Sequence, residues 1–266
     1  MRVFISADIE GVAGISSWDE GRKSHPDYGE FRRQMTAEVR AACEGAQAAG
    51  AQAITVKDAH GSARNLLAAE LPQPAQLIRG WSGHPFAMVQ GLDSSYAAVL
   101  FIGYHARAGA GGNPLSHTMS SARLQRVALN GVPASEYLLY ACAAATIGVP
   151  VVFVSGDETL CREVRETSPA THTFATKWGE GASQHSLHPQ DAIEGIRTGV
   201  THALRERATV APLPLPASFV LDIEYKEHSN AYHRSFYPGA ERLAPNAVRF
   251  TADDYFDVLR ALSFLI

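Results

Sequence analysis

The sequence at residues 2–8 is RVFISAD, a β-rich run that ends in a carboxylate. A long helix-like segment follows at residues 28–49, with Gly50 at the position of a C-terminal cap. Residues 51–57 then predict a second strand. This order of strand, helix and strand is typical of an α/β protein with a parallel sheet.

The alternation continues along the rest of the chain, without an internal repeat. Further apolar runs predict strands at residues 97–104, 149–155 and 219–223, and helices at 135–147, 189–207 and 252–264. The Asn130-Gly131 pair between two β-rich runs predicts a type I′ hairpin. The expected fold is an open, mostly parallel sheet flanked by helices.

Two segments interrupt this pattern. Residues 106–119 contain four glycines and a proline, which predicts a loop beside whatever site the sheet supports. Residues 212–216 (PLPLP) predict an extended connector. We therefore expect residues 1–211 to form the main α/β domain, and residues 212–266 to form a strand–helix segment that packs on it or makes a small C-terminal subdomain.

Composition excludes several classes of protein. The 266 residues carry 23 Lys and Arg against 27 Asp and Glu, a net charge of −4, with no basic block of the kind that binds nucleic acid. The apolar runs are shorter than the ~20 residues of a membrane-spanning helix. Acidic residues interrupt the N-terminal run before a secretory signal could form, and Cys43, Cys142 and Cys161 are widely spaced. These features predict a cytoplasmic protein.

Asp8 and Glu10 follow the first strand, where a period of two places both carboxylates on one side. Their mutual repulsion must be offset by a divalent cation, an arginine or backbone N–H groups. The alternative is a solvated turn after an edge strand.

Histidines follow two other strands, His60 after residues 51–57 and His105 after residues 97–104. Because the carboxyl ends of strands in an open α/β sheet line the ligand crevice, both imidazoles can converge with Asp8 and Glu10. Either histidine could instead be a hydrogen-bonded structural residue.

Two further candidates lie later in the chain. His117 closes the glycine-rich loop, which could cover a crevice, and Glu136 opens the helix after the predicted hairpin. A carboxylate in a first helical turn also has a simpler role, because it favours the positive end of the helix dipole.

The ordered motifs at these positions are SADIEG (residues 6–11), KDAH (57–60), GYHAR (103–107), SH (116–117) and NGVPASE (130–136). In order and spacing they resemble the DppA-like zinc-dependent D-aminopeptidase family. The resemblance is close over about the first 160 residues and looser beyond.

The resemblance implies a dinuclear zinc site whose metal ligands are Asp8, Glu10, His60, His105 and Glu136. By analogy Asp8 would bridge both ions, Glu10 and His60 would complete one, and His105 and Glu136 the other. His117 would be the catalytic side chain. Oxygen and imidazole ligands suit hydrolytic rather than structural zinc.

The same resemblance implies hydrolysis of short peptides with an N-terminal D-amino acid, of the D-Ala-D-Ala type, by a homodecamer. Two alternatives stay open: a dinuclear metal hydrolase of another amide or ester, and a non-catalytic oligomer that binds peptide or metal. Nucleophile-elbow, phosphate-loop and dinucleotide fingerprints are absent from the sequence.

Asp58 and Arg107 adjoin the candidate set. Asp58 could orient a metal-bound imidazole or cap a turn, and Arg107 could bind a substrate carboxylate or lie in solvent.

Overall fold

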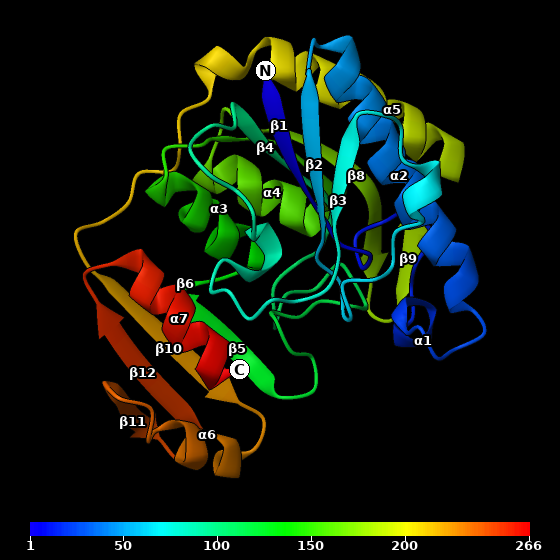
Figure 1. Ribbon diagram of the computed structural model, residues 1–266. Helices are drawn as coiled ribbons and strands as arrows, with labels where there is room; N and C mark the ends of the chain where they lie inside the picture. The colour runs from blue at the N-terminus through cyan, green and yellow to red at the C-terminus, as the bar shows by residue number, and fades with distance from the viewer.

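The computed structural model describes all 266 residues and contains two β-sheets (Figure 1). The main sheet has seven strands in the order β3-β2-β1-β4-β7-β8-β9. Neighbouring strands from β3 to β8 are parallel, and only the edge strand β9 is antiparallel to its neighbour. The structure confirms the expected open, mostly parallel sheet flanked by helices.

The strands of the main sheet are β1 (Arg2–Ala7), β2 (Ala53–Asp58), β3 (Ala75–Ile78), β4 (Ala98–Tyr104), β7 (Val151–Asp157), β8 (His172–Glu180) and β9 (Ser183–Ser186). The second sheet contains β5 (Leu124–Leu129), β6 (Val132–Pro133), β10 (Phe219–Tyr225), β11 (Ala240–Ala244) and β12 (Ala247–Ala252). The helices are α1 (Trp18–Gly21), α2 (Tyr28–Ala48), α3 (Glu136–Thr146), α4 (Glu158–Thr167), α5 (Pro189–Arg205), α6 (His228–Arg234) and α7 (Tyr255–Leu265).

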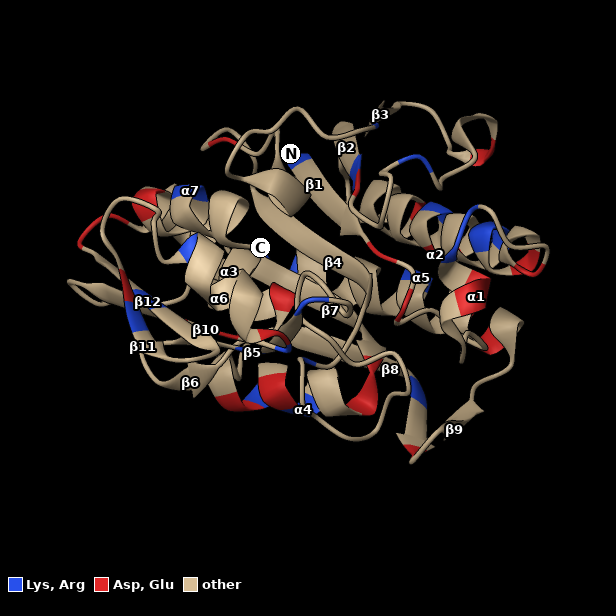
Figure 2. Ribbon diagram, turned by 90° about the horizontal axis from the view of Figure 1, so that it is seen from below, with Lys and Arg blue, Asp and Glu red and all other residues tan.

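Helices cover both faces of the main sheet. On one face α2 and α5 pack together against the strands, with Val39 and Val200 among the apolar side chains buried between them. On the other face α3 and α4 contribute to a second core that extends to α7 and the second sheet. The central strands carry almost no charge, whereas acidic and basic residues lie along the outer helices (Figure 2).

The second sheet is antiparallel and combines two distant parts of the chain. Its order is β11-β12-β10-β5-β6, so the hairpin of β5 and β6 pairs with strands from the last fifth of the sequence. Asn130 and Gly131 both have positive φ at the hairpin turn, as a type I′ turn requires. Because β5 and β6 belong to this sheet, its strands do not all come from residues 212–266, and the division at residue 212 stays a prediction.

Several predicted elements have shifted ends in the structure. The helix expected at 252–264 begins at Tyr255, because the preceding residues form β12 and Asp254 caps the helix by accepting a hydrogen bond from the Phe256 N–H. The hydrophobic periodicity did not predict α4, β8 or β9. Strands β8 and β9 complete the sheet beyond β7. No helix is long and apolar enough to cross a membrane.

The order of the strands reverses between β1 and β4. From β1 the chain builds outward through β2 and β3 on one side, and from β4 through β7 and β8 on the other. Ligands of open α/β sheets bind at such a switch point, beyond the carboxyl ends of the strands. Gly11 makes the close approach possible here, since a Cβ on it would lie 1.7 Å from the carbonyl oxygen of Tyr104.

Candidate active site

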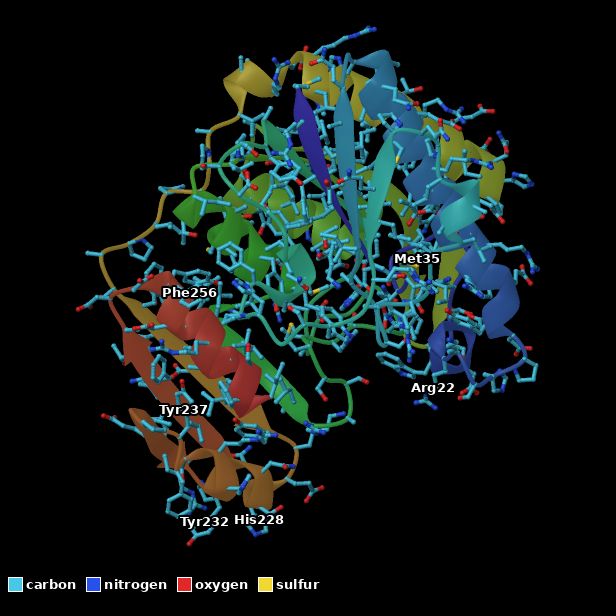
Figure 3. The ribbon with its side chains drawn as sticks, in the orientation of Figure 1. Arg22, Met35, His228, Tyr232, Tyr237 and Phe256 are labelled. Carbon is cyan, nitrogen blue, oxygen red and sulfur yellow. The ribbon has the colours of Figure 1, made fainter.

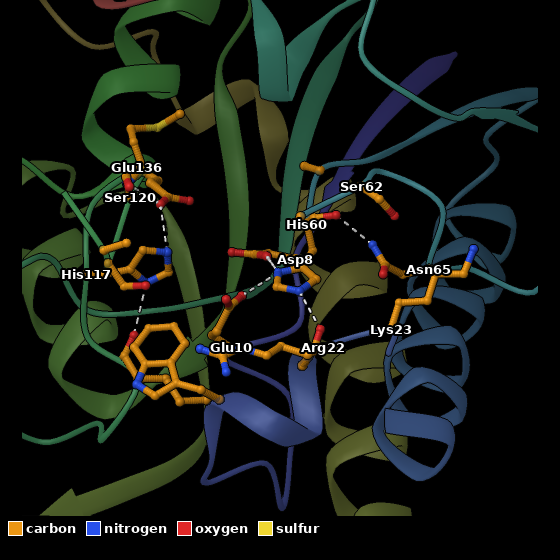
Figure 4. A pocket seen from close by; sticks show the side chains of 18 of the residues that line it. Asp8, Glu10, Arg22, Lys23, His60, Ser62, Asn65, His117, Ser120 and Glu136 are labelled. Atoms are coloured by element: carbon orange, nitrogen blue, oxygen red, sulfur yellow. Dashed lines mark hydrogen bonds and ion pairs between the residues drawn. The ribbon is translucent and has the colours of Figure 1, made fainter. Parts of the chain in front are cut away.

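A cavity of about 830 Å³ opens at this switch point (Figure 4). Three carboxylates and two imidazoles line it, together with two tryptophans and two basic residues: Asp8, Glu10, Glu136, His60, His117, Trp18, Trp81, Arg22 and Lys23. His105 is fully buried beside it. The structure therefore brings together all six site residues expected from the sequence, from five separate motifs of the chain.

Asp8 lies at the centre of the cluster. Its Oδ1 is 3.3 Å from His60 Nδ1, and its Oδ2 is 3.3 Å from His105 Nε2. The Ile9 N–H also donates to Oδ1, which fixes the carboxylate in this orientation. Asp8 thus presents one oxygen to each of two imidazoles.

His60 and Glu10 form one side of the cluster. Glu10 Oε2 is buried and lies 2.9 Å from His60 Nδ1 but makes no hydrogen bond. His60 Nε2 donates to the carbonyl of Gly21, at 2.9 Å, because a carbonyl can only accept. In the neutral ring the lone pair of His60 is therefore on Nδ1, facing the two carboxylates.

His105 and Glu136 form the other side. His105 Nδ1 donates to the carbonyl of Ala106, which leaves the lone pair on Nε2, and this atom has no hydrogen-bond partner. Glu136 Oε2 lies 3.6 Å from it, while Oε1 accepts a hydrogen bond from the Met119 N–H. Glu136 is the first residue of α3, and the helix is capped instead by the hydroxyl of Ser135.

His117 stands next to this second side. Its ring stacks on His105, with centroids 4.2 Å apart, and its Nε2 lies 3.6 Å from Glu136 Oε1. Nδ1 donates to the carbonyl of Leu115, so the lone pair of Nε2 faces the cavity. Trp18 contacts the same ring edge-on.

The buried charges of the cluster compensate one another. Burial raises the pKa of Asp8, but the neighbouring imidazoles of His105 and His60 outweigh burial and hold that pKa below its ordinary value. Burial lowers the pKa of both imidazoles, yet the facing carboxylates, Glu10 for His60 and Glu136 for His105, raise each one well above its usual value. The carboxylates therefore favour positive charge inside the cluster, which a bound cation could supply.

A buried lysine holds the backbone of the loop that carries Glu10, and the sequence pattern did not predict this lysine. Lys177, on β8, donates to the carbonyls of Glu10 (2.6 Å) and Ile15 (2.7 Å). Burial lowers its pKa to about 8. Asn113 also donates to the Glu10 carbonyl and to Asp157, so the loop after β1 is anchored to the end of β7 as well.

Asp58 and Arg107 lie outside the cluster. Asp58 accepts hydrogen bonds from the Asn65 and Leu66 N–H groups and from the Asn65 side chain, so it caps a turn and contacts no imidazole. Asn65 in turn donates to the His60 carbonyl. Arg107 donates only to the carbonyl of Ala108 and does not line the cavity.

Sequence reasoning also missed α1 and the residues that it brings to the cavity. Ser17 and Glu20 form a capping box, a signal that was present as Ser-x-x-Glu at residues 17–20. This short helix carries Trp18 and is followed directly by Arg22. Recognition of the capping box would have predicted a helix start between β1 and α2.

The chain matches the model of the peptidase family M55, described as D-aminopeptidase, over residues 1–264. The chain belongs to the D-aminopeptidase family. It is therefore a peptidase, and the predicted family and the hydrolase class are confirmed.

A curated relative and a solved structure each match this chain over nearly its whole length. The chain is 32% identical to a D-aminopeptidase of Bacillus subtilis (strain 168), over 98% of this chain and 95% of the relative. The solved structure of the Zn-dependent D-aminopeptidase DppA from Bacillus subtilis, described as a self-compartmentalizing protease, superposes with a TM-score of 0.94. That match has 30% identity and covers 100% of this chain and 96% of the other.

Proposed function

We propose that this D-aminopeptidase is a dinuclear zinc enzyme that releases an N-terminal D-amino acid from short peptides such as D-Ala-D-Ala. The observation that carries the proposal is the geometry of Asp8, whose two oxygens face two different imidazoles. Such a carboxylate can bridge two metal ions, with Glu10 and His60 on one and His105 and Glu136 on the other.

The donor atoms fit zinc. Glu10 Oε2 and His105 Nε2 are buried without hydrogen-bond partners, a costly state that a bound cation relieves. The two ligand imidazoles direct their lone pairs inward because carbonyls of Gly21 and Ala106 hold their other nitrogens. The relative described as Zn-dependent supports this choice of metal.

Bound zinc would supply Lewis acidity for the peptide carbonyl and for the attacking water. The protein's own residues supply the rest. His117 Nε2 accepts a proton from water and returns it to the departing amine, and the hydrogen bond from Nδ1 to Leu115 holds the ring in place. The free N-terminal amine of the substrate would coordinate one zinc ion or pair with a carboxylate of the site, which favours an exopeptidase.

The proposal extends to the assembly and the location of the protein. The structural relative is described as self-compartmentalizing, which supports an oligomer of this chain, and we propose a homodecamer. We also propose a cytoplasmic location.

Metal analysis combined with peptide hydrolysis tests this function. Protein purified without added metal is expected to contain about two zinc ions per chain. It should cleave D-Ala-D-Ala faster than L-Ala-L-Ala, and a chelator should abolish cleavage until zinc is restored. N-acetyl-D-Ala-D-Ala serves as the control and should resist hydrolysis, since it lacks the amine.

Each part of this experiment can fail separately. Two zinc ions without cleavage of either peptide would keep the metal site and reject the substrate. Full hydrolysis of the acetylated peptide would reject the exopeptidase mechanism. A protein without metal would reject the ligand assignment.

Zinc binding should release protons. The facing carboxylates raise the pKa values of His60 and His105 well above their ordinary value, which favours the protonated rings in the metal-free protein. Because zinc binds only the neutral ring, loading should release protons, and zinc affinity should increase with pH. Calorimetry in buffers of different ionisation enthalpy measures the proton release. An affinity independent of pH would contradict it.

A further inference from the structure

The charges that line the cavity are separated. All three carboxylates, Asp8, Glu10 and Glu136, belong to the buried metal cluster and are at most 5% exposed as side chains. The two cations, Arg22 and Lys23, lie in the segment that follows α1 and are exposed. The cavity thus has an anionic floor and a cationic rim.

Arg22 is placed where the cavity continues outward. It lines the main cavity and also an adjoining one of about 420 Å³, and Trp18 and His117 line both as well. Its backbone directly follows Gly21, the residue whose carbonyl orients His60. Figure 3 shows Arg22 at the edge of the molecule beside α1.

The guanidinium of Arg22 is available for a ligand. Its only ionic partner is Asp19, at 3.4 Å, and its side chain is 64% exposed. Lys23 lines only the main cavity, and Figure 4 shows its amino group directed away from Glu10, whereas the Arg22 side chain extends past Glu10 in the same view. A planar guanidinium also binds a carboxylate through two parallel hydrogen bonds.

We propose that Arg22 binds the C-terminal carboxylate of the peptide substrate, so that the site recognises both ends of a short peptide. This inference rests on the proposed function, because it assumes that the peptide lies with its amine at the metal cluster. A peptide bound in this way has its amine at the metal cluster and its carboxylate at the cationic rim. The preferred substrates are then peptides of two or three residues with a free carboxylate, and C-terminal amides are poor ligands.

Binding of an uncleavable analogue separates this inference from catalysis. The probe is D-Ala-D-Ala with its peptide bond replaced by CH₂–NH, used as the free acid and as the C-terminal amide, and titrated into the zinc-loaded protein by calorimetry. The wild-type protein should bind the acid about tenfold more tightly than the amide. Arg22→Met should remove this preference by weakening the acid alone, and Arg22→Lys should restore part of it.

Arg33→Met is the matched control. Arg33 is an exposed arginine on α2 that lines neither cavity, so the variant has the same net charge as Arg22→Met. It should keep the wild-type preference for the acid. In turnover of D-Ala-D-Ala, Arg22→Met should raise KM and leave kcat nearly unchanged, as expected for a group that binds substrate and transition state equally.

The outcomes separate the two proposals. Equal binding of acid and amide by the wild-type protein, or an undiminished preference in Arg22→Met, would overturn the role of Arg22 even if D-Ala-D-Ala is hydrolysed. A preference for the acid that depends on Arg22, without hydrolysis of D-Ala-D-Ala, would support the carboxylate site and reject the proposed reaction. Failure of both analogues to bind would overturn the carboxylate site.

Discussion

Asp8→Asn is expected to lose both zinc ions and to lower kcat/KM by about 10³-fold or more. Asp8 is the one residue that faces both imidazoles of the cluster, at 3.3 Å from each. An amide has the same shape but only one oxygen and no charge, so it cannot serve two cations. Zinc content by atomic spectroscopy and hydrolysis of D-Ala-D-Ala measure the two effects.

Asp58→Asn is the matched control for this variant. Asp58 is also a buried carboxylate at the end of a strand, and its neighbour in register on β1 is Ala7, next to Asp8. It accepts its hydrogen bonds from Asn65 and Leu66 and contacts no histidine. Asp58→Asn should lower the thermal stability but keep two zinc ions in the folded protein. Retention of both ions in Asp8→Asn would show that Asp8 does not bridge them.

His117→Ala is expected to lower kcat by about 10²- to 10⁴-fold, the range for removal of a proton-transfer group, while the zinc content stays at two. The ring lies 3.6 Å from Glu136 and presents its free Nε2 to the cavity. Single-turnover kinetics of the zinc-loaded variant measure the chemical step directly.

Zinc content decides between the two possible roles of His117. His105, His117 and Glu136 offer ligand atoms that lie within 4.8 Å of one another, so a metal ligand is the alternative to a proton-transfer group. Loss of one zinc ion in His117→Ala would establish that alternative. His185→Ala is the control, because His185 also stacks on an aromatic ring, that of Trp178, but lies outside the cavity. It should leave kcat and zinc content unchanged.

Turn residues and apolar runs in the sequence were sufficient to predict many of the strands, helices and turns. The hairpin at Asn130-Gly131 and the cap at Gly50 require positive φ, which these residues adopt in the structure. Buried parallel strands such as β1 and β4 have continuous apolar runs. Elements without such signals were missed, notably β8, whose half-exposed positions mix polar and apolar residues.

The pairing of the second sheet could not be predicted from the sequence. Strand β10 pairs with β5, which is about ninety residues earlier in the chain, and with β12. Hydrophobic periodicity indicates that a segment is a strand, but it does not specify the neighbour, because any strand edge offers the same backbone groups. The choice depends on the shared apolar core with α7.

The amino-acid sequence was enough to predict that four candidate metal ligands directly follow strands: Asp8, Glu10, His60 and His105. The carboxyl ends of parallel strands lie at the same edge of the sheet, so the convergence of these four residues follows from the sheet topology. Which nitrogen of each imidazole faces the cluster depends on the folded structure, because the carbonyls of Gly21 and Ala106 accept hydrogen bonds from the other nitrogen of each ring.

The tertiary structure alone also brought Lys177 beneath Glu10 and Arg22 to the rim of the cavity. Lys177 and Glu10 are 167 positions apart, and Arg22 lies in a short segment whose direction depends on the helix before it. No hydrophobic pattern in the sequence indicates that Lys177 is buried between two carbonyls or that Arg22 lies beside a cavity. Their roles come from long-range contacts, which form only when the sheet and its loops have assembled.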